Sequence, residues 1–187
     1  MKKIFKLSSI VLSVFISSAT ISHAQETTAM VGGAAMYPSK NIIENAINSK
    51  DHTTLVAAVK AAGLVETLEG TGPFTVFAPT NEAFNKLPAG AVDNLLQPEN
   101  KGKLAAVLTY HIIAGKIDSK TLMEWIKKNG GTYTATTVQG DKLMFSMKGN
   151  NLMVMDESGN TAKITIKDVY QSNGIIHVID TVLLPKS

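Results

Sequence analysis

The sequence has 187 residues, with 18 lysines, 15 acidic residues, four histidines, and neither cysteine nor arginine. This length suits one ordinary domain, and the missing cysteine excludes disulfides, thiolate metal sites, iron–sulfur clusters and a cysteine nucleophile. Without arginine the chain also lacks the planar side chain that grips phosphate in two places, which argues against nucleotide and nucleic-acid binding.

Residues 1–24 are typical of a secretory signal peptide. Three lysines precede an apolar stretch at residues 7–16, and the small residues Ser22 and Ala24 fit a cleavage site. The apolar stretch is too short and too rich in serine to cross ~30 Å of hydrocarbon, so we predict cleavage rather than a stable membrane anchor. The segment holds three of the 18 lysines and no acidic residue, so the exported chain has 15 of each and no net charge. No basic patch is therefore expected to attract nucleic acid or anionic lipid.

We interpret residues 25–38 as an N-terminal leader, which we expect to be a flexible or loosely docked arm. One domain is expected over residues 39–187, and its first half is mostly helical. A short strand is predicted at residues 74–78, followed by a short helix that Thr80 or Asn81 caps. Apolar residues recur at helical spacing at positions 42–47, 55–62, 104–108 and 122–126.

The second half of the domain changes to a period of two, which indicates strands. The predicted strands cover residues 132–138, 143–147, 152–155 and 163–169. The last run, residues 175–184, is apolar on both faces and predicts a central strand that is covered above and below. A helix-rich first half and a strand-rich second half predict an α+β domain, with helices packed against a sheet or a compact β-sandwich.

Three stretches resemble the fasciclin-type (FAS1) domain family. Residues 74–84 resemble the first signature of that family, residues 108–113 its Tyr-His motif, and residues 173–185 its second signature. Their order and spacing fit a single copy over residues 39–187. The resemblance implies a wedge-shaped β-sandwich flanked by helices, in a single-domain secreted bacterial protein. It also implies adhesion or matrix contact through extracellular protein or polysaccharide partners.

Both signatures have a structural interpretation. The first is a buried strand that Pro79 ends, followed by a polar helix cap. The second is a turn that we expect to need a positive φ at Gly174, followed by a core strand. The residues to which we assign this structural role are Phe77, Pro79, Thr80, Asn81, Phe84, Gly174, His177 and Asp180.

The Tyr-His motif supplies the first candidate partner-binding residues, Tyr110 and His111. In animal adhesion members of the family, this pair with its apolar neighbours has been associated with integrin binding. The alternative is a packed, hydrogen-bonded histidine that links a helix end to the next strand, with the Tyr110 ring in the core. An apolar frame favours this alternative, because a residue locked in such a frame does not easily reach a partner.

A second adhesion motif of those relatives lies just before the last signature, where this chain has Asp168, Val169 and Tyr170. The chain has Ile166 and Lys167 where the relatives have an acidic residue and a proline, which argues against an integrin partner. The alternative role for Asp168 is that of a strand-end carboxylate.

The sequence lacks the patterns of catalysis and metal binding. It has no G-x-S-x-G elbow and no phosphate-binding loop. His52, His111 and His177 are far apart, with no pair at i and i+4, so no metal site is predicted. We therefore expect a non-enzymatic interaction module without a cofactor, secreted to the periplasm or beyond. The alternative is a binder of small apolar, lipid-like ligands, which needs a pocket of at least ~300 Å³ near His111 or among the strand methionines.

Overall fold

The structure is a computed structural model that describes residues 28–186, and the predicted signal peptide at residues 1–24 lies outside them. The helices are α1 (Ile42–Ala46), α2 (Thr53–Ala62), α3 (Val65–Glu69), α4 (Asn81–Asn85), α5 (Ala91–Leu95), α6 (Lys101–Tyr110) and α7 (Ser119–Lys128), with short 3-10 helices at Lys50–His52 and Pro98–Asn100. The strands are β1 (Ala29–Val31), β2 (Ala34–Met36), β3 (Phe74–Pro79), β4 (Ile112–Ala114), β5 (Thr132–Thr136), β6 (Lys142–Lys148), β7 (Asn151–Met155), β8 (Thr161–Gln171) and β9 (Gly174–Ile179). In residues 28–186 no helix has the length and apolar character needed to cross a membrane.

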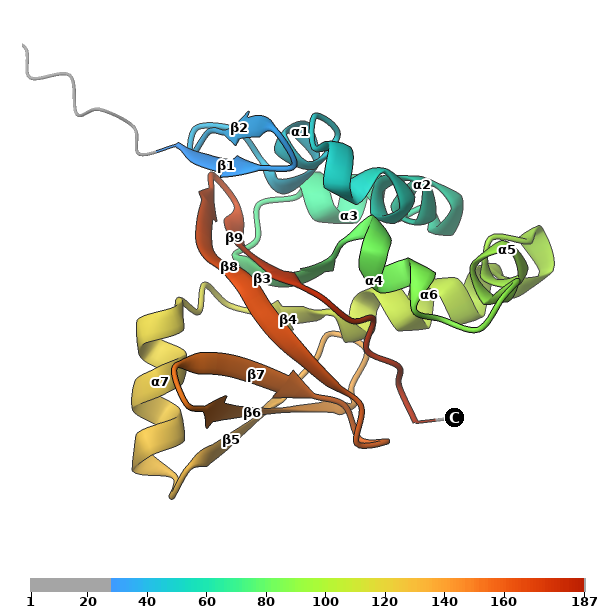
Figure 1. Cartoon of the computed structure of the whole chain (residues 1–187). Coiled ribbons are helices and arrows are strands. Elements are labelled where there is room, and N and C mark those ends of the chain that lie inside the picture. The colour runs from blue at the N-terminus through green and yellow to red at the C-terminus, as the bar shows by residue number, and fades with distance from the viewer. Residues whose placement is uncertain (1–27, 187) are drawn as a thin grey trace, which may run out of the picture.

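Seven strands form one sheet in the order β4-β3-β9-β8-β7-β6-β5 (Figure 1). Strand β9 lies parallel to β3 and antiparallel to β8, so the last strand of the chain is central, as its apolar run predicts. The sheet curls because β8 carries two irregularities in its pairing with β9, and such bulges bend a strand. Beyond β5, the Val138 amide donates to the Ile112 carbonyl at 2.7 Å, so the two ends of the sheet nearly meet. The predicted α+β class is confirmed.

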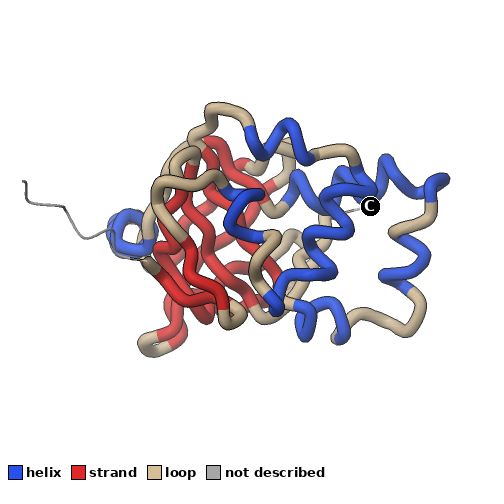
Figure 2. Tube along the Cα trace, turned by 90° about the horizontal axis from the view of Figure 1, so that it is seen from above, coloured by secondary structure: helices blue, strands red, loops and turns tan. Residues whose placement is uncertain are grey.

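Two hydrophobic cores lie on opposite faces of the β3–β9 pair, because neighbouring residues of a strand point to opposite sides. The helical core includes Val76 of β3 and packs against α1, α2 and α6. The sandwich core includes Phe77 of β3, whose ring lies 5.2 Å from that of Phe145, and packs against α7. Figure 2 shows most helices gathered on one side of the strands, while α7 stands alone on the other side.

The expectation of a loosely docked arm at residues 25–38 is wrong for residues 29–36. These residues form the β1–β2 hairpin, and both Val31 and Met36 are only 2 % exposed. The hairpin is tied to the chain that follows it, since the Lys50 amide donates to the Gly32 carbonyl at 3.1 Å. A three-residue strand has too few positions to show an alternating pattern, so the sequence did not predict the hairpin.

The expectation of a positive φ at Gly174 is also wrong, because the backbone of Gly174 is not left-handed. Glycine is required there for a different reason. A Cβ atom at position 174 would lie 2.2 Å from the Phe74 carbonyl oxygen, because β9 begins directly against the start of β3. The left-handed residue of this region is Asp168, with a φ of 62° in the irregular part of β8.

Candidate functional site

Tyr110 lies at the end of α6 and is completely buried. Its hydroxyl group donates to the Lys142 carbonyl at 2.8 Å and accepts from the Glu157 amide at 3.2 Å. Burial raises the pKa of Tyr110 to about 12, so the phenol stays neutral. The side chain thus joins α6 to two segments of the strand-rich half.

His111 is also buried, and both of its ring nitrogens are used. Nδ1 donates to the Val107 carbonyl at 2.8 Å, and Nε2 accepts from the Leu183 amide at 3.0 Å. Burial lowers the pKa of His111 to about 4, so the imidazole is neutral near pH 7. Contact of Tyr110 or His111 with a partner would require α6 to separate from the sheet.

Asp168 lies at the centre of a polar cluster between β8 and the start of α7. Its carboxylate accepts from the amide of Ser119 at 2.7 Å and also from the hydroxyl group of Ser119. The Asp168 amide donates to Nδ1 of His177 at 3.3 Å, and Nε2 of His177 donates to the Ile117 carbonyl at 2.9 Å. These bonds hold the left-handed Asp168 in place and fix β8 against α7.

The cluster contains a serine, a carboxylate and a histidine but lacks the connections of a catalytic triad. The Ser119 hydroxyl group donates to the carboxylate, whereas a triad serine donates to the imidazole. Neither nitrogen of His177 is free, and burial lowers the pKa of this histidine. The imidazole therefore does not act as a base for Ser119 in this arrangement.

Tyr170 follows the cluster and is the exposed member of the predicted Asp168–Tyr170 stretch. Val169 points into the helical core, whereas Tyr170 is 39 % exposed. The Lys116 ammonium nitrogen lies 5.2 Å from the centroid of the Tyr170 ring, within the range of a cation–π contact. This contact could not be predicted from a local pattern, because Lys116 lies far from Tyr170 along the chain.

A second tyrosine–lysine pair lies on the adjoining segment. Tyr37 is 41 % exposed, and the Lys40 ammonium nitrogen lies 5.2 Å from its ring centroid. The Ser172 amide, two residues after Tyr170, donates to the Lys40 carbonyl at 2.9 Å. The four residues Tyr37, Lys40, Lys116 and Tyr170 are called the tyrosine–lysine patch below.

The predicted scaffold residues of the first signature make structural contacts. Thr80 caps α4 by accepting from the Ala83 amide at 3.2 Å. The Asn81 side chain accepts from the Thr54 amide at 3.0 Å and donates to the Lys50 carbonyl at 2.8 Å, which joins α4 to the start of α2. Phe77, Pro79 and Phe84 are buried.

The second signature has a similar contact near its end. The Asp180 carboxylate accepts from the Lys163 amide at 2.8 Å and lies 3.8 Å from the Lys86 ammonium nitrogen. These contacts support the structural role that we assigned to both signatures.

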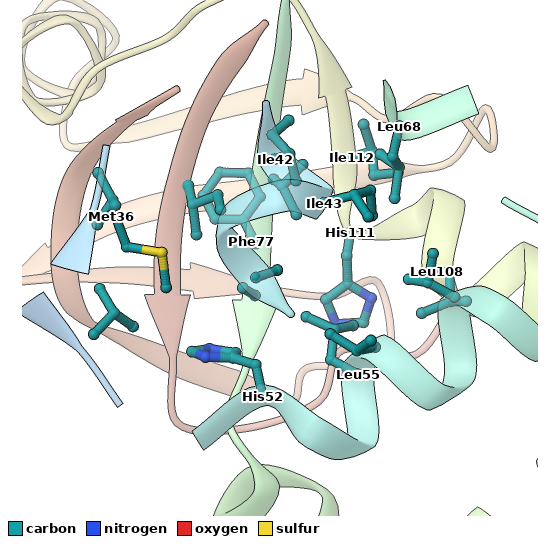
Figure 3. A pocket seen from close by; sticks show the side chains of 18 residues that line it. Met36, Ile42, Ile43, His52, Leu55, Leu68, Phe77, Leu108, His111 and Ile112 are labelled. Atoms are coloured by element: carbon teal, nitrogen blue, oxygen red, sulfur yellow. The ribbon is translucent and has the colours of Figure 1, made fainter. Parts of the chain in front are cut away.

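An apolar cavity of about 40 Å³ lies in the helical core (Figure 3). It is lined by residues of the hairpin, the helices α1, α2, α3 and α6, and the strands β3, β4, β8 and β9, together with His52 and His111. This volume is far below the ~300 Å³ that a lipid-like ligand requires, so the structure does not favour the alternative of a lipid-like binder. Among residues 28–186, no group of three or more His, Asp and Glu side chains is placed to hold a metal ion.

Comparisons with known proteins agree with the signatures. A sequence profile of the fasciclin domain matches residues 50–185. The chain is 46 % identical over 160 residues to protein sll1483 of Synechocystis, across 86 % of this chain and 82 % of that protein. It is 36 % identical over 160 residues to the cell surface glycolipoprotein MPB83 of Mycobacterium bovis, across 83 % of this chain and 64 % of that protein.

A solved structure has a similar fold. The FAS1 domain pair of the insect cell adhesion molecule Fasciclin I matches with a TM-score of 0.70, covering 79 % of this chain and 52 % of that chain. The sequence identity of this match is 19 %, so the likeness concerns the fold alone.

Proposed function

Because this chain belongs to the fasciclin domain family, we propose that it is a non-catalytic module that binds extracellular protein or polysaccharide through the tyrosine–lysine patch. The observation that carries the proposal is the presence of two exposed tyrosine rings, each with a lysine beside it, on adjoining segments. Among the predicted partner-binding residues, Tyr170 alone combines a large apolar surface with exposure to solvent.

The chemistry of the patch favours an anionic polysaccharide. A tyrosine ring offers a rigid apolar face that packs against the C–H face of a sugar, while its hydroxyl group keeps a polar end in water. The Lys40 and Lys116 side chains are exposed, and their ammonium groups attract carboxylate or sulfate groups on the same polymer. A single small patch binds weakly, but a polymer that repeats its binding unit gains affinity by engaging several molecules.

The absence of catalysis is part of the same proposal. It is supported by the cluster at Asp168, in which the Ser119 hydroxyl group is bonded to a carboxylate and both nitrogens of His177 are occupied. An extracytoplasmic location is proposed from the signal peptide expected at residues 1–24. It is also supported by similarity to a protein described as a cell surface glycolipoprotein.

Binding of the exported chain, residues 25–187, to immobilised polymers tests the proposal. Alginate serves as the anionic polysaccharide, dextran as the neutral one and collagen as the protein. We expect binding to alginate that weakens as salt is added, and a loss of about tenfold in affinity when Tyr37→Ala and Tyr170→Ala are combined.

Met144→Ala is the matched control, because Met144 is a large side chain of similar exposure that lies on β6, away from the patch. This variant should bind like the wild type. Binding to collagen but not alginate would redirect the proposal to a protein partner. Binding that survives the loss of both tyrosines, or fails on all three polymers, would overturn the role of the patch.

A further inference from the structure

The face of β6 and β7 that points away from the sandwich core carries three methionines. In β6 the two neighbours of Met144 belong to the sandwich core, so Met144 points to the opposite face. In β7 the same alternation places Met153 and Met155 on that face, because Leu152 and Val154 belong to the sandwich core. Helix α7 packs on the core side of these strands (Figure 1). The three methionines thus lie on the side of the sheet that α7 does not cover.

The register of the two strands brings these methionines close together. Met144 lies directly opposite Met155, which places their Cβ atoms about 4.5–5.5 Å apart. Met153 lies about 7 Å from Met155 along β7 and about 7–8 Å diagonally from Met144. Each sulfur atom lies two bonds beyond its Cβ atom on an unbranched side chain with three rotatable bonds. Side-chain rotation alone is therefore enough to turn the three sulfur atoms toward one point above the sheet.

Packing in the two cores does not account for these methionines. Met144 is 37 % exposed, Met153 and Met155 are half-buried, and none of the three belongs to either core. Their neighbours on the same face are polar, since Thr134 of β5 lies opposite Met144 and Thr161 of β8 lies opposite Met155. Threonine is a usual residue on a solvated strand face, because it is both β-branched and polar. Three adjacent thioether groups on such a face need another explanation.

The chemistry of the thioether group indicates a soft metal ion. Thioether sulfur is a soft ligand that selects Cu(I), whereas calcium and magnesium prefer oxygen ligands. If metal–sulfur bonds are about 2.3 Å long, as in zinc sites, three sulfur atoms around one ion lie about 4 Å apart, which the Cβ spacing permits. Among residues 28–186 no group of His, Asp and Glu side chains is placed to hold a metal ion. A metal ion on this face would therefore be one that accepts thioether ligands alone.

The exported chain offers few competing ligands for such an ion. It has no cysteine, and its histidines His52, His111 and His177 are all buried. Met30 and Met147 are exposed as well, but each is isolated, because the residues opposite them in their strand pairs are an alanine and a leucine. The face of β6 and β7 is thus the place where exposed methionines lie opposite each other in the described part of the chain.

We propose that Met144, Met153 and Met155 bind one soft monovalent metal ion through their three sulfur atoms, Cu(I) being the biological ion of this class. Binding replaces ligands of the free ion by thioether groups, without electron transfer and without release of a proton. Lys163 lies opposite Met153 but is exposed, so its ammonium group extends into water, where salt screens its repulsion of the ion. The site is separate from the tyrosine–lysine patch, and its occupation does not depend on the proposed adhesion.

Methionine methyl NMR spectra of the exported chain, residues 25–187, test the proposal. Ag(I) is the first probe, as an air-stable ion of the same softness and charge, in a buffer without chloride. Coordination withdraws electron density from sulfur, so the methyl resonances of Met144, Met153 and Met155 should shift together and saturate at an equimolar ratio. The resonances of Met30 and Met147 should not shift at that ratio. Cu(I), added without oxygen, should shift the same three resonances.

Leucine variants then separate the sulfur atoms from the apolar surface. Met155→Leu keeps the apolar side chain and removes one ligand. The affinity for Ag(I) should fall at least about tenfold, because even the loss of an outer partner of a metal ligand costs that much. Met147→Leu is the matched control, since Met147 has the same 37 % exposure as Met144 and lies on the opposite face of β6. Its affinity should stay within about twofold of the wild type.

Three results would overturn the proposal. The first is a wild-type protein in which neither ion shifts the three methyl resonances. The second is an equal response of Met30, Met147 and the three methionines, which would mean that each methionine binds metal alone. The third is an affinity for Ag(I) that is the same in Met155→Leu and in the wild type. The spectra of the wild-type protein need no substitution, so the first two results decide the question even if Met155→Leu does not fold.

Discussion

The helical core and the sandwich core share β3 and β9, but they differ in how closely they are packed and in how their polar groups are bonded. In the sandwich core, Tyr110 and His177 are buried with every polar side-chain atom hydrogen bonded. The helical core contains a cavity and the unpartnered Nε2 of His52. Each core is built from the same kinds of apolar side chain, so composition does not explain the difference.

The difference lies in the elements that close each core. The sandwich core is closed by the ten-residue helix α7 and by long antiparallel strands, whose side chains interlock at regular spacing. The helical core is closed by the five-residue helix α1 and by a hairpin of three-residue strands. Short elements present few side chains to a large surface, and gaps between those side chains remain unfilled. The region with imperfect packing is thus the one that contains the cavity.

Acid should weaken both cores and has the largest expected effect. The pKa of His111 is about 4 in the folded chain against an ordinary 6.5, so between these values the unfolded chain binds a proton that the folded chain does not. The free energy of unfolding should fall as the pH drops through this window, by roughly 3 kcal/mol for His111 alone. Burial lowers the pKa of His52 and His177 too, which adds to the effect.

Urea unfolding between about pH 7.5 and about pH 4.5 measures this dependence. In His111→Gln the free energy of unfolding should depend less on pH, because the contribution of His111 is removed. This difference in slope is expected whatever the absolute stability of the variant. Equal pH slopes in the variant and the wild type would contradict the assignment of a neutral, buried imidazole.

A pair of histidine substitutions sharpens the comparison. His177→Leu leaves the Ile117 carbonyl and the Asp168 amide without partners, so the free energy of unfolding should fall by about 2–4 kcal/mol. His52→Leu breaks only the bond to Ser49 and removes a group that is already unpartnered, so the loss should be about 1 kcal/mol or less. Denaturant unfolding near pH 7 compares the two. Equal losses in the free energy of unfolding would mean that the buried histidines of the two cores are equally well hydrogen bonded.

A pair of valine substitutions gives the smallest effect and tests packing alone. Val76 in β3 lines the cavity, whereas Val154 in β7 is completely buried in the sandwich core. Val76→Ile adds one methylene to empty space and should be neutral or stabilise the chain by up to about 0.8 kcal/mol. Val154→Ile should destabilise it by about 1–2 kcal/mol through overpacking. Thermal unfolding compares the stabilities of the two variants. A less stable Val76→Ile than Val154→Ile would show that the cavity does not accept added volume.

For the Tyr-His motif, the sequence predicted the burial of the side chains but not their hydrogen-bond partners. The apolar neighbours of Tyr110 and His111 made a packed role the favoured alternative, and the structure places both side chains in the interior. Their bonding partners were not predictable, because Lys142 lies 32 residues from Tyr110 and Leu183 lies 72 residues from His111. Whether either residue meets a partner stays a prediction.

For the tyrosine–lysine patch, the sequence predicted one exposed residue but not the contacts that it makes. Tyr170 was predicted as a partner-binding residue from its place before the second signature, but its contact with Lys116 and the hydrogen bond between Ser172 and Lys40 depend on the path of the chain. The docking of the hairpin and the lack of a hydrogen-bond partner for Nε2 of His52 also depend on the path of the chain. A local sequence pattern does not predict that a buried polar group lacks a hydrogen-bond partner, because this depends on all the residues that pack around the group.

The sequence by itself determined the helix-rich first half and the strand-rich second half, the central place of the last strand, the α+β class and the family, because periodicity, turn residues and signatures are local. The tertiary structure alone decided why residue 174 is glycine, how residues 29–36 dock and which buried polar groups are satisfied. These features depend on distances between segments far apart in the chain. Such distances are set by the packing of all side chains together, and no short stretch of sequence contains them.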